Sequence, residues 1–130
     1  MVSKNKPPFV SWNRLKSSFV YALRGIRRTW RSEQNFRIHS VMFVVVILLA
    51  QLLNVPPVEQ AVLMIVIGAV IGLELINTSL ESIVDLVVQE YDERAKIIKD
   101  AAAGAVFIFS LTAVIVGLII FIPRMIETIL

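Results

Sequence analysis

The segment Gly72-Leu-Glu74-Leu-Ile-Asn77-Thr-Ser-Leu-Glu81-Ser-Ile-Val-Asp85 continues an apolar run that begins at Ala61, yet it contains three carboxylates and an amide. Ionisable residues at membrane depth cost roughly 2.5–3.5 kcal/mol each at the centre of a helix, and they are rare without a function. On an α-helix, five of its polar side chains fall within a sector of about 100°: Glu74, Asn77, Thr78, Glu81 and Asp85. The segment therefore predicts a membrane helix whose polar face needs a partner, an ion or a substrate.

The composition agrees with a membrane protein. The chain has 130 residues, is 57% hydrophobic and has a mean hydropathy of +0.78, which is too apolar for an ordinary soluble domain. It contains no cysteine, which excludes disulfides and thiolate metal sites, and its single histidine, His39, excludes a histidine-rich metal site. No nucleic-acid partner is predicted, and no Walker-type or GxGxxG phosphate loop occurs.

Residues 9–31 are expected to form an amphipathic helix that lies in the membrane interface. Apolar residues form one stripe and arginines form the opposite face: Trp12, Leu15, Phe19, Ala22, Leu23, Ile26 and Trp30 against Arg14, Arg24, Arg27, Arg28 and Arg31. A soluble helix that packs on a partner is the alternative. The polar residues that follow favour a new helix start, with Ser32 as a candidate cap and Glu33 in a favourable position for the helix dipole.

Three apolar runs are candidates to cross a bilayer whose hydrocarbon core is about 30 Å thick. They cover residues 36–54, 61–88 and 100–122. Pro56 and Pro57 are expected to turn the chain after the first run, residues 90–99 to form a charged connector, and Pro123 to end the third run. The predicted fold class is an all-α membrane protein, with a surface helix and three transmembrane helices in one domain over residues 1–130.

Basic residues predict the orientation of these helices. Nine of the thirteen Lys and Arg residues precede position 38. The positive-inside rule then places the N-terminus and the 90–99 loop on the cytoplasmic side of the cell membrane. Three helices leave little room to hide charges, so an oligomer is expected.

The carboxylates of the polar face lie at different depths in the predicted membrane helix. Glu81 and Asp85 lie near the predicted cytoplasmic end of the helix, whereas Glu74 lies about 10 Å deeper. Glu33 and Glu81 suit an oxygen-ligated Mg²⁺ that keeps phosphate or water ligands. Lys99, with the N-terminal arginines, suits phosphate oxygens. Glu74, in a desolvated position, could accept a proton from a lipid hydroxyl.

Each of these groups also has a plainer interpretation. Glu74 and Asn77 could hydrogen-bond between helices, and Glu81 and Asp85 could pair with Lys99 or with arginines. Glu33, Asp100 and His39 could be, respectively, a first-turn acid, a solvated loop residue and a polar contact. The convergence of all these groups on one membrane face favours a function.

The segment Glu74–Asp85 resembles the signature of the prokaryotic diacylglycerol kinase family. The resemblance extends to Trp30-Arg-Ser-Glu33-Gln-Asn-Phe36-Arg37 and to Lys99-Asp100-Ala-Ala-Ala-Gly104, so it covers nearly the whole chain. It implies a homotrimeric integral membrane kinase with three spans and an N-terminal surface helix. It also implies transfer of the γ-phosphoryl of ATP to a lipid alcohol with Mg²⁺.

Position by position, the resemblance implies Glu74 as the general base, Asn77 as a polar residue beside it, and Glu33 with Glu81 as metal ligands. The nucleotide site that it implies adds Arg14, Tyr21, Glu90, Tyr91, Lys99 and Asp100, and Arg14 is also assigned to the lipid substrate. Asp92 is also assigned to the nucleotide site, at a position where a well-studied form has histidine. The 35–39 segment and the alanine run look more like the Gram-positive branch, whose members are mainly undecaprenol kinases.

The sequence therefore predicts an ATP- and Mg²⁺-dependent lipid kinase in the bilayer, with undecaprenol as the preferred acceptor and diacylglycerol as the alternative. The rival from another class is a small non-enzymatic membrane subunit, whose buried acids carry protons or hold helices together.

Overall fold

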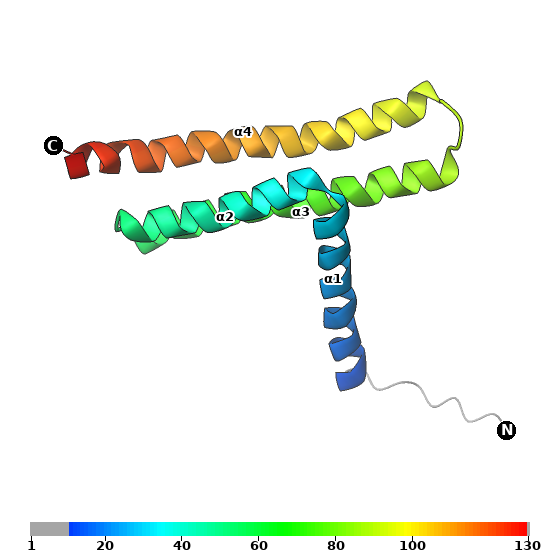
Figure 1. Cartoon of the computed structure of the whole chain (residues 1–130), viewed down its shortest axis with the longest axis horizontal. Coiled ribbons are helices and arrows are strands. Elements are labelled where there is room, and N and C mark those ends of the chain that lie inside the picture. Colours follow the sequence, from blue (N-terminus) through cyan, green and yellow to red (C-terminus); the bar gives the residue numbers. More distant parts are fainter. Residues whose placement is uncertain (1–10, 130) are drawn as a thin grey trace.

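The computed structural model describes residues 11–129, which form four helices and no strand. The helices are α1 (Trp12–Ser32), α2 (Gln34–Leu52), α3 (Pro57–Val87) and α4 (Glu93–Ile129). Figure 1 shows α2, α3 and α4 running side by side along the long axis, while α1 leaves this bundle steeply. The helices α2, α3 and α4 are each long and apolar enough to cross a membrane. The all-α class and the three candidate spans are thus confirmed.

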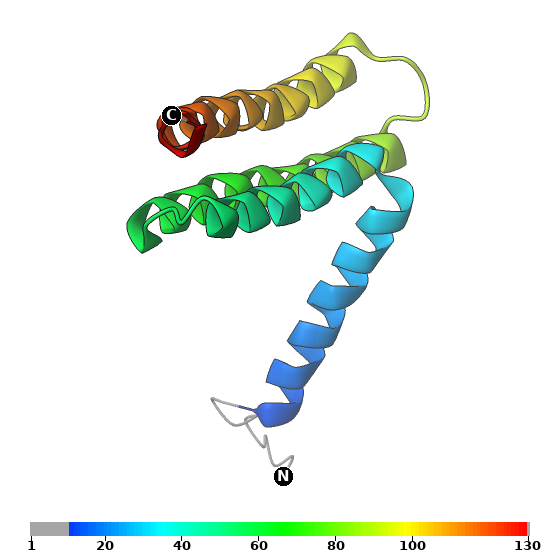
Figure 2. The same ribbon diagram turned by 60° about the vertical axis from the view of Figure 1, so that its left-hand side comes forward.

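The amphipathic helix exists as expected, although residues 9 and 10, which the sequence assigns to it, lie outside the described residues. Its apolar side chains, such as Trp12 and Phe19, remain exposed within this chain. In Figure 2 only the C-terminal end of α1 approaches the bundle. An exposed apolar stripe opposite a basic face is typical of a helix that lies on a bilayer.

The junction between α1 and α2 is a single extended residue, Glu33, with φ −106° and ψ 120°. The guanidinium of Arg37 donates to the carbonyl oxygens of Trp30 at 3.1 Å and Arg31 at 3.2 Å, which are otherwise unpaired at the end of α1. The rings of Trp30 and Phe36 meet edge to face with centroids 6.4 Å apart. These contacts fix the angle at which α1 leaves the bundle.

The expectation that Ser32 caps the second helix is wrong. Ser32 is the last residue of α1, and its hydroxyl points back to the carbonyl of Thr29 at 3.5 Å. Glu33 occupies the N-cap position of α2, without a side-chain cap hydrogen bond. Because Glu33 is extended, one residue ends the first helix and starts the next.

A tight turn joins α2 to α3. Asn54 has a φ of 49°, the left-handed conformation that asparagine tolerates better than most residues. The side-chain amide of Gln60 donates to the carbonyl of Val55 at 2.7 Å, and Gln51 donates to Gln60 at 2.8 Å. Pro57 is the first residue of α3, a position where its missing N–H costs nothing. The second span therefore starts four residues earlier than the predicted residue 61.

The last helix differs most from its prediction, because it runs from Glu93 to Ile129 rather than from 100 to 122. Asp92 starts it: its Oδ1 accepts the backbone N–H of Arg94 at 2.8 Å. Pro123 lies inside the helix instead of ending it. Membrane helices tolerate interior proline because neighbouring groups satisfy the freed backbone. Beyond it, Arg124 pairs with Glu59 at 2.6 Å and holds the end of α4 against the start of α3.

The buried core is small and lies close to the α2–α3 turn. It contains Ala50 of α2, Val55 of the turn, Leu63 of α3, and Ile120 and Phe121 of α4. The outward faces of the three long helices carry many exposed Ile, Leu, Val and Phe side chains. In a bilayer, lipid tails cover such faces, so the exposed apolar surface fits a membrane protein.

Candidate active site

The polar face of α3 follows from helical periodicity. Glu74 is only 3% exposed, and Asn77 and Glu81 are half-buried on the same side. The amide Nδ2 of Asn77 donates to Oε1 of Glu81 at 3.0 Å, one helical turn along. The hydroxyl of Thr78 donates to the backbone carbonyl of Glu74 at 3.0 Å. The stripe is thus an ordered face in which Asn77 orients the Glu81 carboxylate.

Two other elements bring charge to this face. The carboxylate of Glu74 interacts electrostatically with Glu33 at the α1–α2 junction, with His39 of α2 and with Glu81 of its own helix. In Figure 1 the α1–α2 junction meets α3 part-way along its length, short of the connection to α4. The fold therefore brings Glu33, Glu74 and Glu81 into one region.

One polar atom in this region lacks a partner. Among the described residues, Oδ1 of Asn77 is buried and accepts no hydrogen bond. A buried unpaired acceptor costs free energy unless a ligand or water supplies a donor. This oxygen is therefore suited to a donor group that enters beside Glu81.

Lys99 lies on α4 and faces α3. Its Nζ lies 2.5 Å from Oδ1 of Asp85, so one of the plainer alternatives, an ion pair between these residues, is present. The side chains of Lys99 and Asp85 remain 34% and 65% exposed, so the ammonium can still reach a second anion. Asp100 is exposed on α4 next to this pair.

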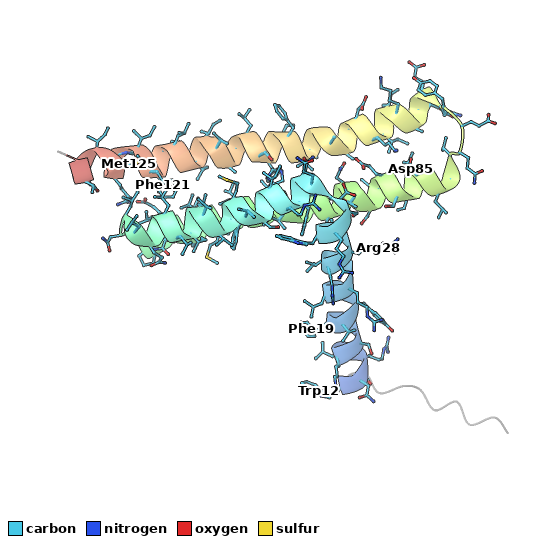
Figure 3. All side chains as sticks on the ribbon, in the orientation of Figure 1. Trp12, Phe19, Arg28, Asp85, Phe121 and Met125 are labelled. Atoms are coloured by element: carbon cyan, nitrogen blue, oxygen red, sulfur yellow. The ribbon has the colours of Figure 1, made fainter. Side chains whose placement is uncertain are left out.

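The remaining predicted nucleotide residues are spread over two surfaces. Arg14 and Tyr21 are exposed on α1, and the Arg24 guanidinium lies 5.9 Å from the centre of the Tyr21 ring. Figure 3 labels Trp12 and Phe19 in the same half of α1, far from the bundle, so this chain does not bring that half to the polar face of α3. Glu90 and Tyr91 are exposed in the α3–α4 connection, where Asp92 caps α4.

The carboxylates fit a magnesium site of the open kind. Residues 11–129 contain no group of three or more His, Asp or Glu side chains placed to hold a metal ion by themselves. Mg²⁺ usually needs only one or two carboxylates, because substrate phosphates and water complete its shell. The carboxylates of Glu33 and Glu81 both lie near Glu74, so their type and number are those that such a site needs.

Residues 20–121 match the sequence profile of the prokaryotic diacylglycerol kinases, which is most of the chain. The chain belongs to the prokaryotic diacylglycerol kinase family. It is therefore an enzyme, a membrane lipid kinase that transfers a phosphoryl group from ATP. Family membership excludes the rival interpretation as a non-enzymatic subunit and confirms the resemblance found in Glu74–Asp85.

Individual relatives carry two different names. An undecaprenol kinase of Bacillus subtilis (strain 168) is 41% identical over 113 residues, which cover 87% of this chain and 92% of that protein. A diacylglycerol kinase of Synechocystis is 46% identical over 111 residues, 85% of this chain but 63% of that protein. The diacylglycerol kinase of Escherichia coli (strain K12) is 29% identical over 104 residues, 80% of this chain and 85% of that protein.

His39, interpreted from the sequence as a polar contact at the start of the first span, lies within electrostatic range of Glu74. The carboxylate of Asp92 caps α4 and pairs with Arg94 at 2.9 Å, a structural role that was not predicted from the sequence. The sequence carried a signal for the cap, because an aspartate before an acidic first turn is typical of a helix start.

Proposed function

We propose that this protein phosphorylates undecaprenol, with ATP as phosphoryl donor and Mg²⁺ as cofactor. The convergence of Glu33, Glu74 and Glu81 beside Asn77 carries the proposal, together with membership in a lipid kinase family. The name and the near-complete overlap of the Bacillus subtilis relative support undecaprenol as the acceptor.

In the proposed mechanism, Glu74 accepts the proton of the lipid hydroxyl while that oxygen attacks the γ-phosphorus of ATP. A new O–P bond forms, the bond between the γ-phosphorus and the β,γ-bridging oxygen breaks, and ADP leaves. Mg²⁺ held by Glu33 and Glu81 would neutralise charge on the phosphates. Glu74 is nearly fully buried, so the lipid hydroxyl would have to leave bulk water to reach its carboxylate.

Lys99 is the cation proposed for the triphosphate, with Asp85 holding its ammonium in place. Four further residues would flank the nucleotide near the α3–α4 connection: Glu90, Tyr91, Asp92 and Asp100. Arg14 and Tyr21 lie apart from this face in one chain, so they would reach a nucleotide only across a subunit boundary. This separation supports the proposal of a homotrimer with shared sites. The proposed orientation in the membrane places α1 and the α3–α4 connection on the cytoplasmic side.

The proposal is tested with Glu74→Gln in purified protein. If Glu74 is the base, this substitution should lower turnover by about 10²–10⁴-fold. ATP should still bind with near-normal affinity. The control is Glu127→Gln, which changes an exposed glutamate near the C-terminal end of α4. Near-normal turnover of Glu74→Gln would remove Glu74 from the base role.

Diacylglycerol is the second candidate acceptor, because the Synechocystis relative that is 46% identical is named a diacylglycerol kinase. Parallel assays with undecaprenol and diacylglycerol in the same bicelles decide between them through the ratio of kcat/KM. A ratio in favour of diacylglycerol would reverse the assignment of substrate.

A further inference from the structure

The helix α1 carries a high positive charge that the described part of the chain does not neutralise. Its residues Trp12–Ser32 include six Lys and Arg side chains and no Asp or Glu, whereas the net charge of the whole chain is only +3. Within residues 11–129, none of the ion pairs involves a side chain of α1. The charge of this helix is therefore available to an anion from outside the chain.

Four of these basic side chains form one surface, which we call the arginine patch: Arg24, Arg27, Arg28 and Arg31. All four are exposed, and together with Ser32 they line a hollow of about 410 Å³. Residues three and four apart are neighbours on a helix, and like charges at this spacing destabilise it. The arginine patch is therefore a surface that gains stability when an anion binds.

The arginine patch borders the apolar stripe of α1. Arg27 follows Leu23 by four residues and precedes Trp30 by three, so these side chains are neighbours on the helix surface. Leu23 is 65% exposed and Trp30 is 42% exposed. A soluble anion, such as a nucleotide, would pair with the arginines but leave the apolar stripe in water. A bilayer surface offers phosphate groups and hydrocarbon side by side, so it fits both parts of the helix.

We propose that the arginine patch binds the phosphate groups of anionic phospholipids, so that the bilayer around α1 is enriched in these lipids. Arginine suits this ligand, because its planar guanidinium can donate two parallel hydrogen bonds to one phosphate. Each basic residue near an anionic membrane surface strengthens binding by about fivefold. The proposal requires only that α1 lies on a membrane, and it does not depend on which lipid alcohol the enzyme phosphorylates.

Trp30 provides the readout, because Trp12→Phe leaves it as the only tryptophan of the chain, next to Arg27. This full-length parent variant is reconstituted into vesicles with equal amounts of phosphatidylcholine and phosphatidylglycerol. One of the two lipids carries brominated acyl chains, which quench tryptophan fluorescence. The measured quantity is the association of phosphatidylglycerol with the Trp30 region relative to that of phosphatidylcholine. We expect a ratio of about five or more. The ratio should fall towards unity at about 1 M salt, where the Debye length is about 3 Å.

The charge of the patch is removed by combining Arg27→Gln, Arg28→Gln and Arg31→Gln in the same parent protein. Gln favours a helix about as well as Arg does, so α1 should stay helical. Arg24 is left unchanged, because its guanidinium lies 5.9 Å from the centre of the Tyr21 ring. We expect the ratio to fall close to unity. The three corresponding lysine substitutions keep the charge and should retain most of the lipid preference.

Lys96→Gln is the matched control, because it removes an exposed positive charge from α4 instead of α1. Its ratio should equal that of the parent protein, and an equal loss in this control would overturn the proposal. A ratio near unity in the parent protein would also overturn it. If the three glutamine substitutions leave the ratio unchanged but raise the KM for ATP, the patch binds the nucleotide and the proposal is wrong.

Discussion

The ammonium of Lys99 lies 2.5 Å from the carboxylate of Asp85, which ties α4 to α3 one turn beyond Glu81. Both side chains are partly exposed, so the pair is screened by solvent and contributes about 0–1 kcal/mol to folding. A pair so weak in stability terms is explained better by the position it gives to a cation beside the carboxylates.

Lys99→Ala should therefore raise the KM for ATP about tenfold or more, since a hydrogen bond to a charged group is worth about 1.5–3 kcal/mol. Asp85→Asn keeps the cation and should raise this KM less. Both variants should unfold within about 1 kcal/mol of the wild type. Equal loss of activity in the two variants, together with lower stability, would make the pair structural.

Glu33→Gln and Glu81→Gln should each raise the Mg²⁺ concentration needed for half-maximal activity. Removing a carboxylate ligand should weaken Mg²⁺ binding. Even the mutation of a residue that only hydrogen-bonds to a metal ligand lowers metal affinity by about 10–100-fold. The measurement is a Mg²⁺ titration of turnover at saturating ATP. Glu93→Gln, an exposed acid in the first turn of α4, is the control. An unchanged titration for Glu33→Gln would remove Glu33 from the metal site.

Asp92 controls the start of α4, and its effect depends on pH. The Arg94 side chain lowers the pKa of Asp92, because the guanidinium and the backbone N–H of Arg94 both favour the ionised carboxylate. A lowered pKa means that the contribution is present at neutral pH and is lost as the pH falls through the pKa of the folded state.

Hydrogen exchange measures this effect at the amides of Arg94 and Ala95. Asp92→Ala should speed their exchange at neutral pH, whereas Asp92→Asn should keep most of the protection, because asparagine also caps helices. Equal protection in Asp92→Ala and wild type would show that the cap does not order the start of α4.

Arg124→Gln should weaken the attachment of the end of α4 to α3. The guanidinium of Arg124 pairs with Glu59 at 2.6 Å, and both side chains are partly exposed. Their coupling in a double-mutant cycle with Glu59→Gln should be about 1 kcal/mol or less. The KM for ATP should not change, because this pair lies at the opposite end of α3 from Asp85. A changed KM would mean that the two ends of the bundle are coupled.

Much of the fold was predictable because a bilayer imposes strong patterns on sequence. The apolar runs that became α2, α3 and α4 and the amphipathic stripe of α1 follow from hydropathy and helical periodicity. Helix ends were harder to predict. The charges of residues 90–99 indicated a connector, but the Asp92 cap starts α4 within this stretch, and Pro123 does not end that helix.

The sequence by itself determined which residues share a face: the spacing of Glu74, Asn77 and Glu81 places them on one side of α3 whatever surrounds that helix. Only the tertiary structure decided what faces them. Glu33 and His39 lie within electrostatic range of Glu74 because α2 packs along α3. Lys99 meets Asp85 because α4 packs back along α3. Periodicity is a local property of the chain, whereas the partners of a polar face depend on how whole helices pack.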